Sequence, residues 1–447
     1  MCTLYILNFS SHVDRWSSKF TWGGINLPQT DEFVIIQENH TVLLDTETSI
    51  LKMLLIDGGT LIFDEKTSPH LRAENIMLTN NGRLIIGESE INPYRGKSAK
   101  ITMFGHLRSL ELPIYGTKTL AVRNGTLKIH GKPKTPVWTN LRETVKAGLD
   151  LIKLREQVNW EVGDLVSIAT TGYKNSQQEN EEARISEILE SGELTGAVLK
   201  LDRVLKFEHL SKFYPDSDFE ISAEVGVLTR NIVFQGFNDP QWNDKIPACP
   251  DNFEPDEMAT QNCFSGKFGE EVGSDQFGGC IMVHPKSDAE KDTAKLELTN
   301  LEVTYAGQAF RLGRYPIHFH FLKDSSSYVK DCSVHHVFNR AIVIHHTNRV
   351  RIENNVLFNV LGGSIFIEDG IEEFNLIKGN LVVFTRQSQA LLNADITPAG
   401  IWITNPMNYI EDNVVAGGTH FGFWYRMHQH PDDQSFRRDY AGGCEKR

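Results

Sequence analysis

The feature that most constrains this chain is a repeat in its C-terminal third. Similar segments begin at Arg314, Arg340 and Gly362, at offsets of 26 and 22 residues, and each contains a short apolar strand. Two further segments of this kind begin at Ala399 and Phe421. A period in the twenties with short strands is typical of a β-solenoid, in which each turn of chain stacks on the one before it. We therefore predict an all-β fold built on a right-handed parallel β-helix.

The corners between these strands carry a second pattern. The pairs Asn354-Asn355, Gly379-Asn380 and Asp412-Asn413 fall at matching points, each just before a pair of Val or Leu residues. Asn and Gly tolerate the positive φ angles that tight corners need. We expect these Asn residues to stack from one turn to the next.

Upstream of the repeat, residues 21–141 alternate β-branched or Leu-rich runs with Gly, Asn and Asp turns, which predicts further strands and no helices. Residues 142–293 are less regular, with a strand at Trp160–Ile168 and a long loop at 237–279 that is rich in Asn, Asp, Pro and Gly. We expect an N-terminal extension (residues 1–20) followed by an N-terminal β-domain (residues 21–141) and a β-rich connecting region (residues 142–293). The β-helix repeats (residues 294–435) and a tail (residues 436–447) complete the chain.

Charge and hydropathy narrow the choice of partners. The 447 residues carry a formal net charge of −13, whereas nucleic acid and anionic lipid surfaces both require a concentrated basic face. Nucleic acid is therefore not an expected partner. No stretch approaches the roughly 18 consecutive apolar residues of a membrane span, and the N-terminus lacks the pattern of a signal peptide.

Cysteines and sequons indicate an extracellular protein. Three glycosylation sequons begin at Asn8, Asn39 and Asn124. Six cysteines are present, and Cys249 and Cys263 bracket part of the long loop, where a disulfide between them is expected. The alternative is a set of buried free thiols.

Several segments resemble a known family. The glycine spacing from Trp22 to Gly131 resembles the G8 domain, a module named for its eight glycines. Similarity to the fibrocystin-L family, whose members combine G8 domains with parallel β-helix repeats, continues in Gly105–Arg108, Phe268–Cys280, Gly313–His318, Ile367–Glu372 and Gly417–Arg426. The resemblance implies that residues 21–141 are a G8 domain and covers about residues 21–435.

The same resemblance implies a place and a role for the chain. The family has a long ectodomain that ends in one membrane span, so this sequence is expected to be a fragment, attached to the membrane only through parts that it does not contain. It implies a rigid cell-surface module for adhesion or for binding an extracellular protein or glycosaminoglycan. Related G8 proteins, the cell-migration-inducing hyaluronan-binding protein and the transmembrane hyaluronidase, depolymerise hyaluronan. Whether this chain is an enzyme therefore stays open.

One column of polar side chains could carry chemistry. Alternate residues of a strand face the same side, so His318 and His320 project together, and the stacked turns would add His346 and Glu368, followed by Thr404 and Arg426. Histidine and carboxylate side chains can act together in acid/base catalysis. The predicted catalytic residues of a depolymerase are His320, His346 and Glu368.

Other functions remain open for the same region. Guanidinium groups bind uronate carboxylates through two hydrogen bonds, and the expected ligand-binding residues are His318, Arg314, Arg340, Asp369 and Arg426. The alternatives are corner salt bridges and a polar column that only satisfies its own hydrogen bonds. The imidazoles of this column and Glu368 also have the atoms to bind a zinc-like ion, although the set rests on an inferred register.

No cofactor is required by these patterns. Hard oxygen ligands at Glu270, Glu271 and Asp275 would suit calcium, but their spacing does not match a regular calcium loop. Trp402, Trp424 and Tyr425 could stack on sugar rings, or could simply fill the interior of the solenoid.

Overall fold

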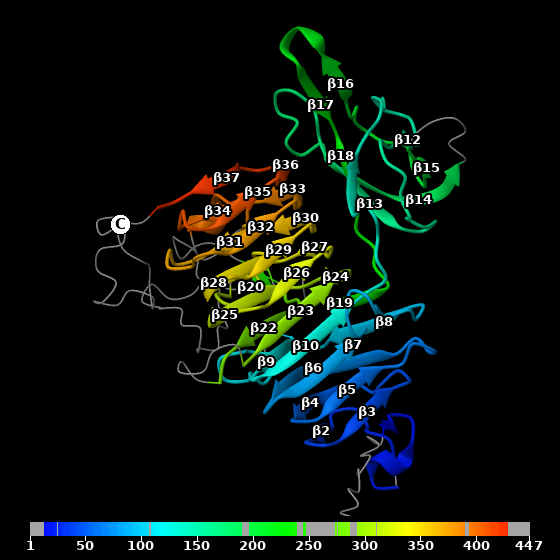
Figure 1. Cartoon of the computed structure of the whole chain (residues 1–447), viewed down its shortest axis with the longest axis vertical. Helices are drawn as coiled ribbons and strands as arrows, with labels where there is room; N and C mark the ends of the chain where they lie inside the picture. Colours follow the sequence, from blue (N-terminus) through cyan, green and yellow to red (C-terminus); the bar gives the residue numbers. More distant parts are fainter. Residues whose placement is uncertain are drawn as a thin grey trace, which may run out of the picture.

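The computed structural model is a tall parallel β-helix with a smaller antiparallel domain on one side (Figure 1). It describes residues 13–24, 26–106, 109–189, 196–238, 245–246, 273–274, 276–286, 293–309, 311–388 and 393–427. The strands of the helix pair in parallel with the strands one turn before and after, which confirms the solenoid expected from the repeat.

The strands of the helix form three stacks. The first stack contains β2 (Phe33–Gln37), β4 (Leu51–Asp57), β6 (His70–Thr79), β9 (Thr119–Arg123), β22 (Cys280–His284), β25 (Ile317–Asp324), β28 (Ile342–Asn348), β31 (Ile365–Ile367), β34 (Ala399–Ile403) and β37 (Phe421–Tyr425).

The second stack is a ten-stranded sheet of β1 (Val13–Arg15), β3 (Thr41–Leu44), β5 (Thr60–Phe63), β7 (Gly82–Ile86), β10 (Gly125–His130), β23 (Lys295–Thr299), β26 (Tyr328–Lys330), β29 (Arg351–Glu353), β32 (Leu376–Lys378) and β35 (Tyr409–Glu411). The third stack starts from the first half of β6 and continues through β8 (Ala99–Met103), β19 (Ile232–Gly236), β24 (Leu301–Thr304), β27 (Ser333–Val337), β30 (Val356–Leu361), β33 (Leu381–Arg386) and β36 (Val414–Gly418).

One hydrophobic core fills the helix from end to end. It runs from Trp16 to Ile403 and is made of the residues that alternate inward along each strand, most of them Leu, Ile and Val. Strand β10 pairs directly with β23, with Leu127 opposite Leu296, although 169 positions separate them in the sequence. The N-terminal β-domain and the C-terminal repeat therefore form consecutive turns of one helix and share its core.

The Asn corners stack as the sequence predicted. The side-chain amide of Asn355 donates to the side-chain oxygen of Asn380 at 2.9 Å, and that of Asn380 donates to Asn413 at 2.8 Å. The residue before each of them has a positive φ, as in Asn354 at 53° and Gly379 at 66°. This ladder satisfies buried amide groups at a corner where the backbone leaves the sheet.

A second unit interrupts the helix between β10 and β19. It is a six-stranded antiparallel sheet with its own core, extended by the hairpin β16–β17. Its strands are β11 (Trp138–Asn140), β12 (Leu151–Lys153), β13 (Leu165–Ile168), β14 (Glu181–Leu189), β15 (Val198–Leu201), β16 (Ser211–Tyr214), β17 (Phe219–Ser222) and β18 (Glu224–Val227). We call it the inserted domain.

The inserted domain packs on the later turns of the helix (Figure 1). Val137 and Leu228 share an apolar cluster with Val356 and Phe358 of β30. The indole N–H of Trp138 donates to the carbonyl of Gly379 at 2.9 Å. The region expected as a connector, residues 142–293, thus contains most of the inserted domain together with two strands of the helix.

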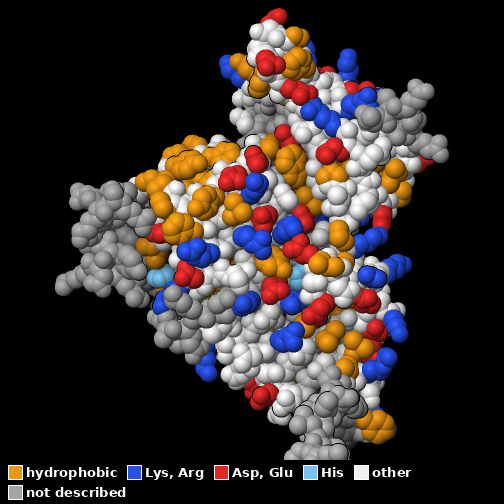
Figure 2. All heavy atoms as spheres, viewed as in Figure 1, with side chains coloured by type: hydrophobic (Ala, Val, Ile, Leu, Met, Phe, Trp, Pro, Cys, Tyr) orange, Lys and Arg blue, Asp and Glu red, His pale blue; other side chains and the backbone are white. Residues whose placement is uncertain are grey.

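The remaining elements are short: 3-10 turns at Lys19–Trp22 and Pro215–Ser217, the strand pair β20 (Lys245–Ile246) and β21 (Gly273–Ser274), and the helix α1 (Asn393–Ile396). Across the described ranges, no helix has the length and apolar character needed to cross a membrane. Figure 2 shows charged side chains of both signs over most of this face, with hydrophobic side chains gathered over β36 and β37.

Candidate functional site

The strand β25 presents two histidines on the outside of the helix. Ile317 and Phe319 point into the core and are fully buried. Because alternate residues of a strand face opposite sides, His318 and His320 project outward. Both imidazoles are nevertheless buried, with 1% and 5% of their surface exposed. The predicted outward pair is therefore present, but it lies in a covered site rather than on an open face.

The third histidine of the site is His345. The sequence predicted His346 at this position, which is wrong by one residue. His320 lies directly opposite His345 in the pairing of β25 with β28. His346 has a positive φ of 47° and its ring stacks on Phe321 instead. The physical reason is that the two strands pair at an offset of 25 residues from Ile317 and Ile342 onward, so Ile344 faces the core and His345 projects outward.

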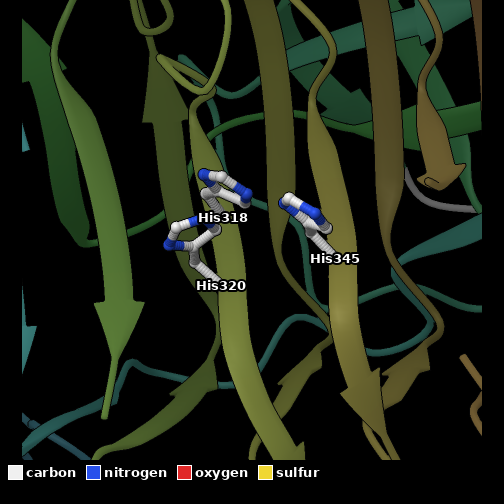
Figure 3. Close-up of side chains that lie close together, drawn as sticks. All are labelled: His318, His320 and His345. Carbon is white, nitrogen blue, oxygen red and sulfur yellow. The ribbon is translucent and has the colours of Figure 1, made fainter. Parts of the chain in front are cut away.

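The three imidazoles of His318, His320 and His345 face one another (Figure 3). One ring nitrogen from each lies within 4.8 Å of the others. The ring centroids of His318 and His320 are 4.8 Å apart, and those of His320 and His345 are 5.0 Å apart. We call this group the imidazole cluster.

Two of these rings are oriented by fixed acceptors. Nδ1 of His318 donates to the carbonyl oxygen of Gly313 at 3.0 Å, and Nε2 of His345 lies 3.0 Å from a carboxylate oxygen of Asp369. These contacts set the tautomers, because a carbonyl or carboxylate oxygen requires the N–H form of the nitrogen that faces it. The other nitrogen of the His318 ring, Nε2, is then a lone-pair donor.

Burial keeps the first of these rings neutral. Desolvation holds the pKa of His318 well below its ordinary value of 6.5, and the neighbouring His320 and His345 add to that effect. A neutral imidazole with one nitrogen fixed as a donor is a base or a ligand, and is not an acid at physiological pH.

Glu368 lies next to the imidazole cluster but is held by other groups. Its Oε1 accepts hydrogen bonds from Arg340 at 3.0 Å and from the hydroxyl of Tyr315 at 3.2 Å, and its Oε2 lies 3.7 Å from Nδ1 of His345. Arg340 also forms a two-pronged ion pair with Asp395 at 2.7 and 3.2 Å. Burial opposes the charge of Arg340, but Asp395, Tyr315 and Glu368 together raise its pKa above the ordinary value.

The other expected ligand-binding residues do not share one surface. Arg314 and Asp369 are buried, whereas Arg426 is exposed and lies 6.0 Å above the ring of Trp402. Thr404 donates to the carbonyl of Ile367 at 3.2 Å. Of the expected arginines, Arg426 is therefore the exposed one, and Arg340 neutralises carboxylates inside the protein.

His284 belongs to the same column, and the repeat pattern gave no sign of it. His284 of β22 precedes His320 in the same stack, with ring centroids 5.1 Å apart. Its strand falls before the recognised repeat, so the repeat could not reveal it. Trp402 and Trp424 stack on each other along the neighbouring column, with ring centroids 5.8 Å apart, and Trp402 is 5% exposed. Trp402 therefore packs against the protein, while Tyr425 is exposed.

Two of the three predicted sequons lie in the described part of the chain. Asn39 is exposed in the turn between β2 and β3, and Asn124 is half-buried. Asn8, Cys249, Cys263 and the acidic residues Glu270, Glu271 and Asp275 lie outside the described residues, so the first sequon, the disulfide and the calcium site stay predictions. Cys280 and Cys332 are buried free thiols, and burial raises the pKa of each to about 12.

A second candidate site lies where the inserted domain joins the helix. It is a cleft of about 430 Å³ bounded by the two connecting segments, and its walls contain five cationic side chains and two carboxylates. The cations are Arg95, Lys97, Lys132, Lys134 and Arg230, and the carboxylates are Glu161 and Asp164. Five positive and two negative charges leave an excess of three positive charges. We call this the junction cleft.

Hydrogen bonds hold the walls of the junction cleft in place. The side chain of Asn231 donates to the carbonyls of Tyr94 and Gly96, both at 3.2 Å, and accepts from the backbone of Lys132 at 2.8 Å. The buried ion pair of Lys134 with Asp164, at 2.6 Å, fixes the opposite wall. Arg95 and Lys97 remain exposed at the rim.

The fold and the similarity of the sequence to known families define the class of this protein: it is a parallel β-helix protein with a G8 domain. The family model described as the G8 domain matches residues 21–142, and the one described as the CEMIP β-helix matches residues 276–447. The G8 segment supplies the early turns of the helix, and the second match covers the turns that carry the imidazole cluster.

The chain is a homologue of fibrocystin-L. It is 52% identical to human fibrocystin-L over 98% of this chain and 10% of that protein, and 50% identical to the mouse protein over the same shares. Dog fibrocystin is 28% identical over 97% of this chain and 11% of its own length. The chain thus spans about a tenth of the length of these relatives. The tailspike of Acinetobacter baumannii bacteriophage AP22 aligns with 92% of this chain and 66% of its own at 9% identity, with a TM-score of 0.19.

Proposed function

We propose that this chain is a rigid ligand-binding module in the ectodomain of a cell-surface protein, and that it binds an acidic glycan of the glycosaminoglycan class in the junction cleft. The homology to fibrocystin-L and the sequons support an extracellular setting. The observation that carries the proposal is the excess of three positive charges in a cleft whose walls are braced by hydrogen bonds. This excess stands out in a chain of net charge −13.

The chemistry of the rim suits a uronate-containing chain. Arg95 and Lys97 are exposed, and their cationic groups are not engaged by a carboxylate in the contacts of the described chain, so they are available to an incoming anion. An arginine fork can grip one carboxylate through two hydrogen bonds, while a lysine adds a compact charge. Lys132 and Lys134 are paired with Glu161 and Asp164, and they shape the cleft rather than offer free charge.

A charge-reversal experiment tests this site. The parent chain and the Arg95→Glu, Lys97→Glu double variant would be titrated with hyaluronan oligosaccharides in a calorimeter at low and at physiological salt. We expect the double variant to bind at least about 10-fold more weakly, because each lost charge-assisted hydrogen bond contributes about 1.5–3 kcal/mol. We also expect the parent affinity to fall as salt rises.

The matched control reverses two exposed lysines of the inserted domain, Lys174→Glu and Lys212→Glu, which lie away from the cleft lining. It changes the net charge of the chain by the same amount. Equal loss of affinity in both double variants would mean that net charge, and not the junction cleft, governs binding. A parent chain that binds no oligosaccharide would overturn the glycan proposal and direct attention to a protein ligand.

A second candidate function is depolymerisation of hyaluronan. The observation that favours it is the convergence of His320, His345 and Glu368 on one face of the helix. The same geometry weighs against it, because Glu368 is held by Arg340 and Tyr315 and its neighbour Asp369 is buried against His345. Glycosidases normally need two carboxylates that flank an accessible sugar.

The test is the size distribution of long hyaluronan after incubation with the parent chain and with a His320→Ala, Glu368→Ala double variant. Shortening by the parent but not by the variant would establish the depolymerase and place its site. Unchanged hyaluronan with a folded parent chain would leave binding as the function.

A further inference from the structure

We propose that His318, His320 and His345 bind a divalent transition-metal ion of the zinc class on the outside of the β-helix. The inference is independent of the glycan proposed for the junction cleft, which lies at the junction with the inserted domain and is lined by other residues. It rests on four observations of the imidazole cluster: the spacing of its nitrogens, the fixed orientation of two rings, an unpartnered buried nitrogen, and the contrast with a second pair of histidines.

The spacing is close to that of a metal site. One nitrogen from each ring lies within 4.8 Å of the other two. Three imidazole nitrogens at tetrahedral angles around zinc would be about 3.3 Å apart, since each zinc–nitrogen bond is about 2.0–2.1 Å long. Small side-chain rotations on two neighbouring strands can close this gap, without a change in the register of His320 and His345.

The orientation of the rings is that of metal ligands. A ligating histidine normally donates its other N–H to a backbone carbonyl or a carboxylate, which fixes the tautomer and aims the lone pair. His318 does this with the carbonyl of Gly313, and His345 does it with Asp369. The second ring nitrogen is Nε2 in His318 and Nδ1 in His345.

One of these nitrogens has no partner in the protein. His318 is 1% exposed, and its Nε2 makes no hydrogen bond within the described part of the chain. A buried polar atom without a partner costs about 1–3 kcal/mol, so native proteins rarely retain one. A metal ion would supply the missing partner. Glu368, whose Oε2 is 3.7 Å from Nδ1 of His345, supplies nearby negative charge.

A second histidine pair differs from the imidazole cluster, because the Nε2 atom of each of its rings lies against a carboxylate. His335 and His336 of β27 each face a carboxylate, with Nε2 of His335 3.3 Å from Glu302 and Nε2 of His336 3.2 Å from Glu182. Within the described residues, the imidazole cluster is the group with metal-ligand spacing. Its donors are imidazoles, which suit zinc, copper and nickel rather than calcium or magnesium.

The experiment is metal binding by the whole chain, stripped with a chelator and then loaded with zinc or cobalt. We expect about one zinc ion per chain after gel filtration, and with cobalt the visible absorption of a four- or five-coordinate site. His320→Gln, which removes a ligand but keeps a polar side chain of similar length, should weaken zinc binding at least about 100-fold. His335→Ala, a buried histidine outside the cluster, is the matched control and should bind like the parent.

A positioning variant separates metal binding from general damage to the fold. Asp369→Asn should weaken zinc affinity about 10–100-fold while one ion per chain still binds at saturation, because Asp369 orients a ligand without being one. Zinc should also raise the melting temperature of the parent and of His335→Ala but not that of His320→Gln. Failure of the folded parent chain to retain zinc or cobalt, or equal retention by His320→Gln, would overturn the proposal.

Discussion

At the scale of single residues, Arg340 carries a buried charge that several contacts hold in place. Its side chain is 2% exposed, contacts Asp395 and Glu368, and lies 3.9 Å above the ring of Phe366. A buried cation of this kind is tolerated only because two carboxylates balance it. Arg340 therefore ties α1 to the turns that carry the imidazole cluster, and it has a structural role where the sequence suggested ligand binding.

Replacing Arg340 tests that role. We expect Arg340→Met to destabilise the chain by about 3 kcal/mol or more, because Asp395 and Glu368 would be left buried without a cation. Arg349→Met is the control, since Arg349 is 60% exposed and its contact with Asp324 is a surface pair. It should change stability by less than about 1 kcal/mol. Urea unfolding of both variants measures the difference, and similar losses would argue against a buried network at Arg340.

At the scale of secondary-structure elements, the Asn corners determine how one turn of the helix stacks on the next. Asn380 accepts from the backbone and side chain of Asn355 and donates to Ile352 and Asn413. Each of these bonds links consecutive turns, so the ladder works alongside the apolar core to hold the register.

The corner ladder should be sensitive to one substitution. Asn380→Ala leaves buried donors and acceptors of the adjacent turns without partners, so we expect a loss of about 3 kcal/mol or more. Asp412→Asn is the control, because Asp412 lies at the same corner with its side chain 78% exposed. Hydrogen exchange in β30 and β33 would report the loss locally. Unchanged protection in Asn380→Ala would show that the core alone holds the turns together.

At the scale of the whole molecule, a charged contact joins the inserted domain to the helix in addition to the apolar cluster. Glu182 of β14 lies 3.2 Å from Nε2 of His336 in β27. This hydrogen bond holds the pKa of Glu182 below its ordinary value of 4.5, against the opposing effect of burial, and His335 and Arg203 add to it. The contact therefore favours the docked domain while Glu182 is ionised.

The sign of this pH dependence follows from the lowered pKa. The stabilisation is fully present above the pKa of the unfolded chain, about 4.5, and is lost as pH falls through the lower pKa of the folded chain. The parent should melt at a higher temperature than Glu182→Gln at pH 5.5, and the two should converge near pH 3. Glu187→Gln, an exposed carboxylate of the same strand, should match the parent at both values. A gap that persists at pH 3 would assign the effect of Glu182 to packing.

Much of the architecture was determined by the sequence alone, because it depends on local patterns. The alternation of apolar residues predicted the strands, the repeat predicted the parallel stacking, and the Asn pairs predicted the corner ladder, all of which the structure confirms. Each signal lies within one turn of chain or between neighbouring turns, and so survives in a linear sequence.

Only the tertiary structure showed which residues come together at the two candidate sites. His345 replaced His346 because the apolar run Ile342–Ile344 fits either register in the sequence, and only the paired strands show that Ile342 lies opposite Ile317. The pairing of β10 with β23 across the inserted domain, and the junction cleft built from four separate segments, bring together residues far apart in the chain. Such contacts depend on where the chain returns after the insertion, a long-range choice that no local pattern encodes.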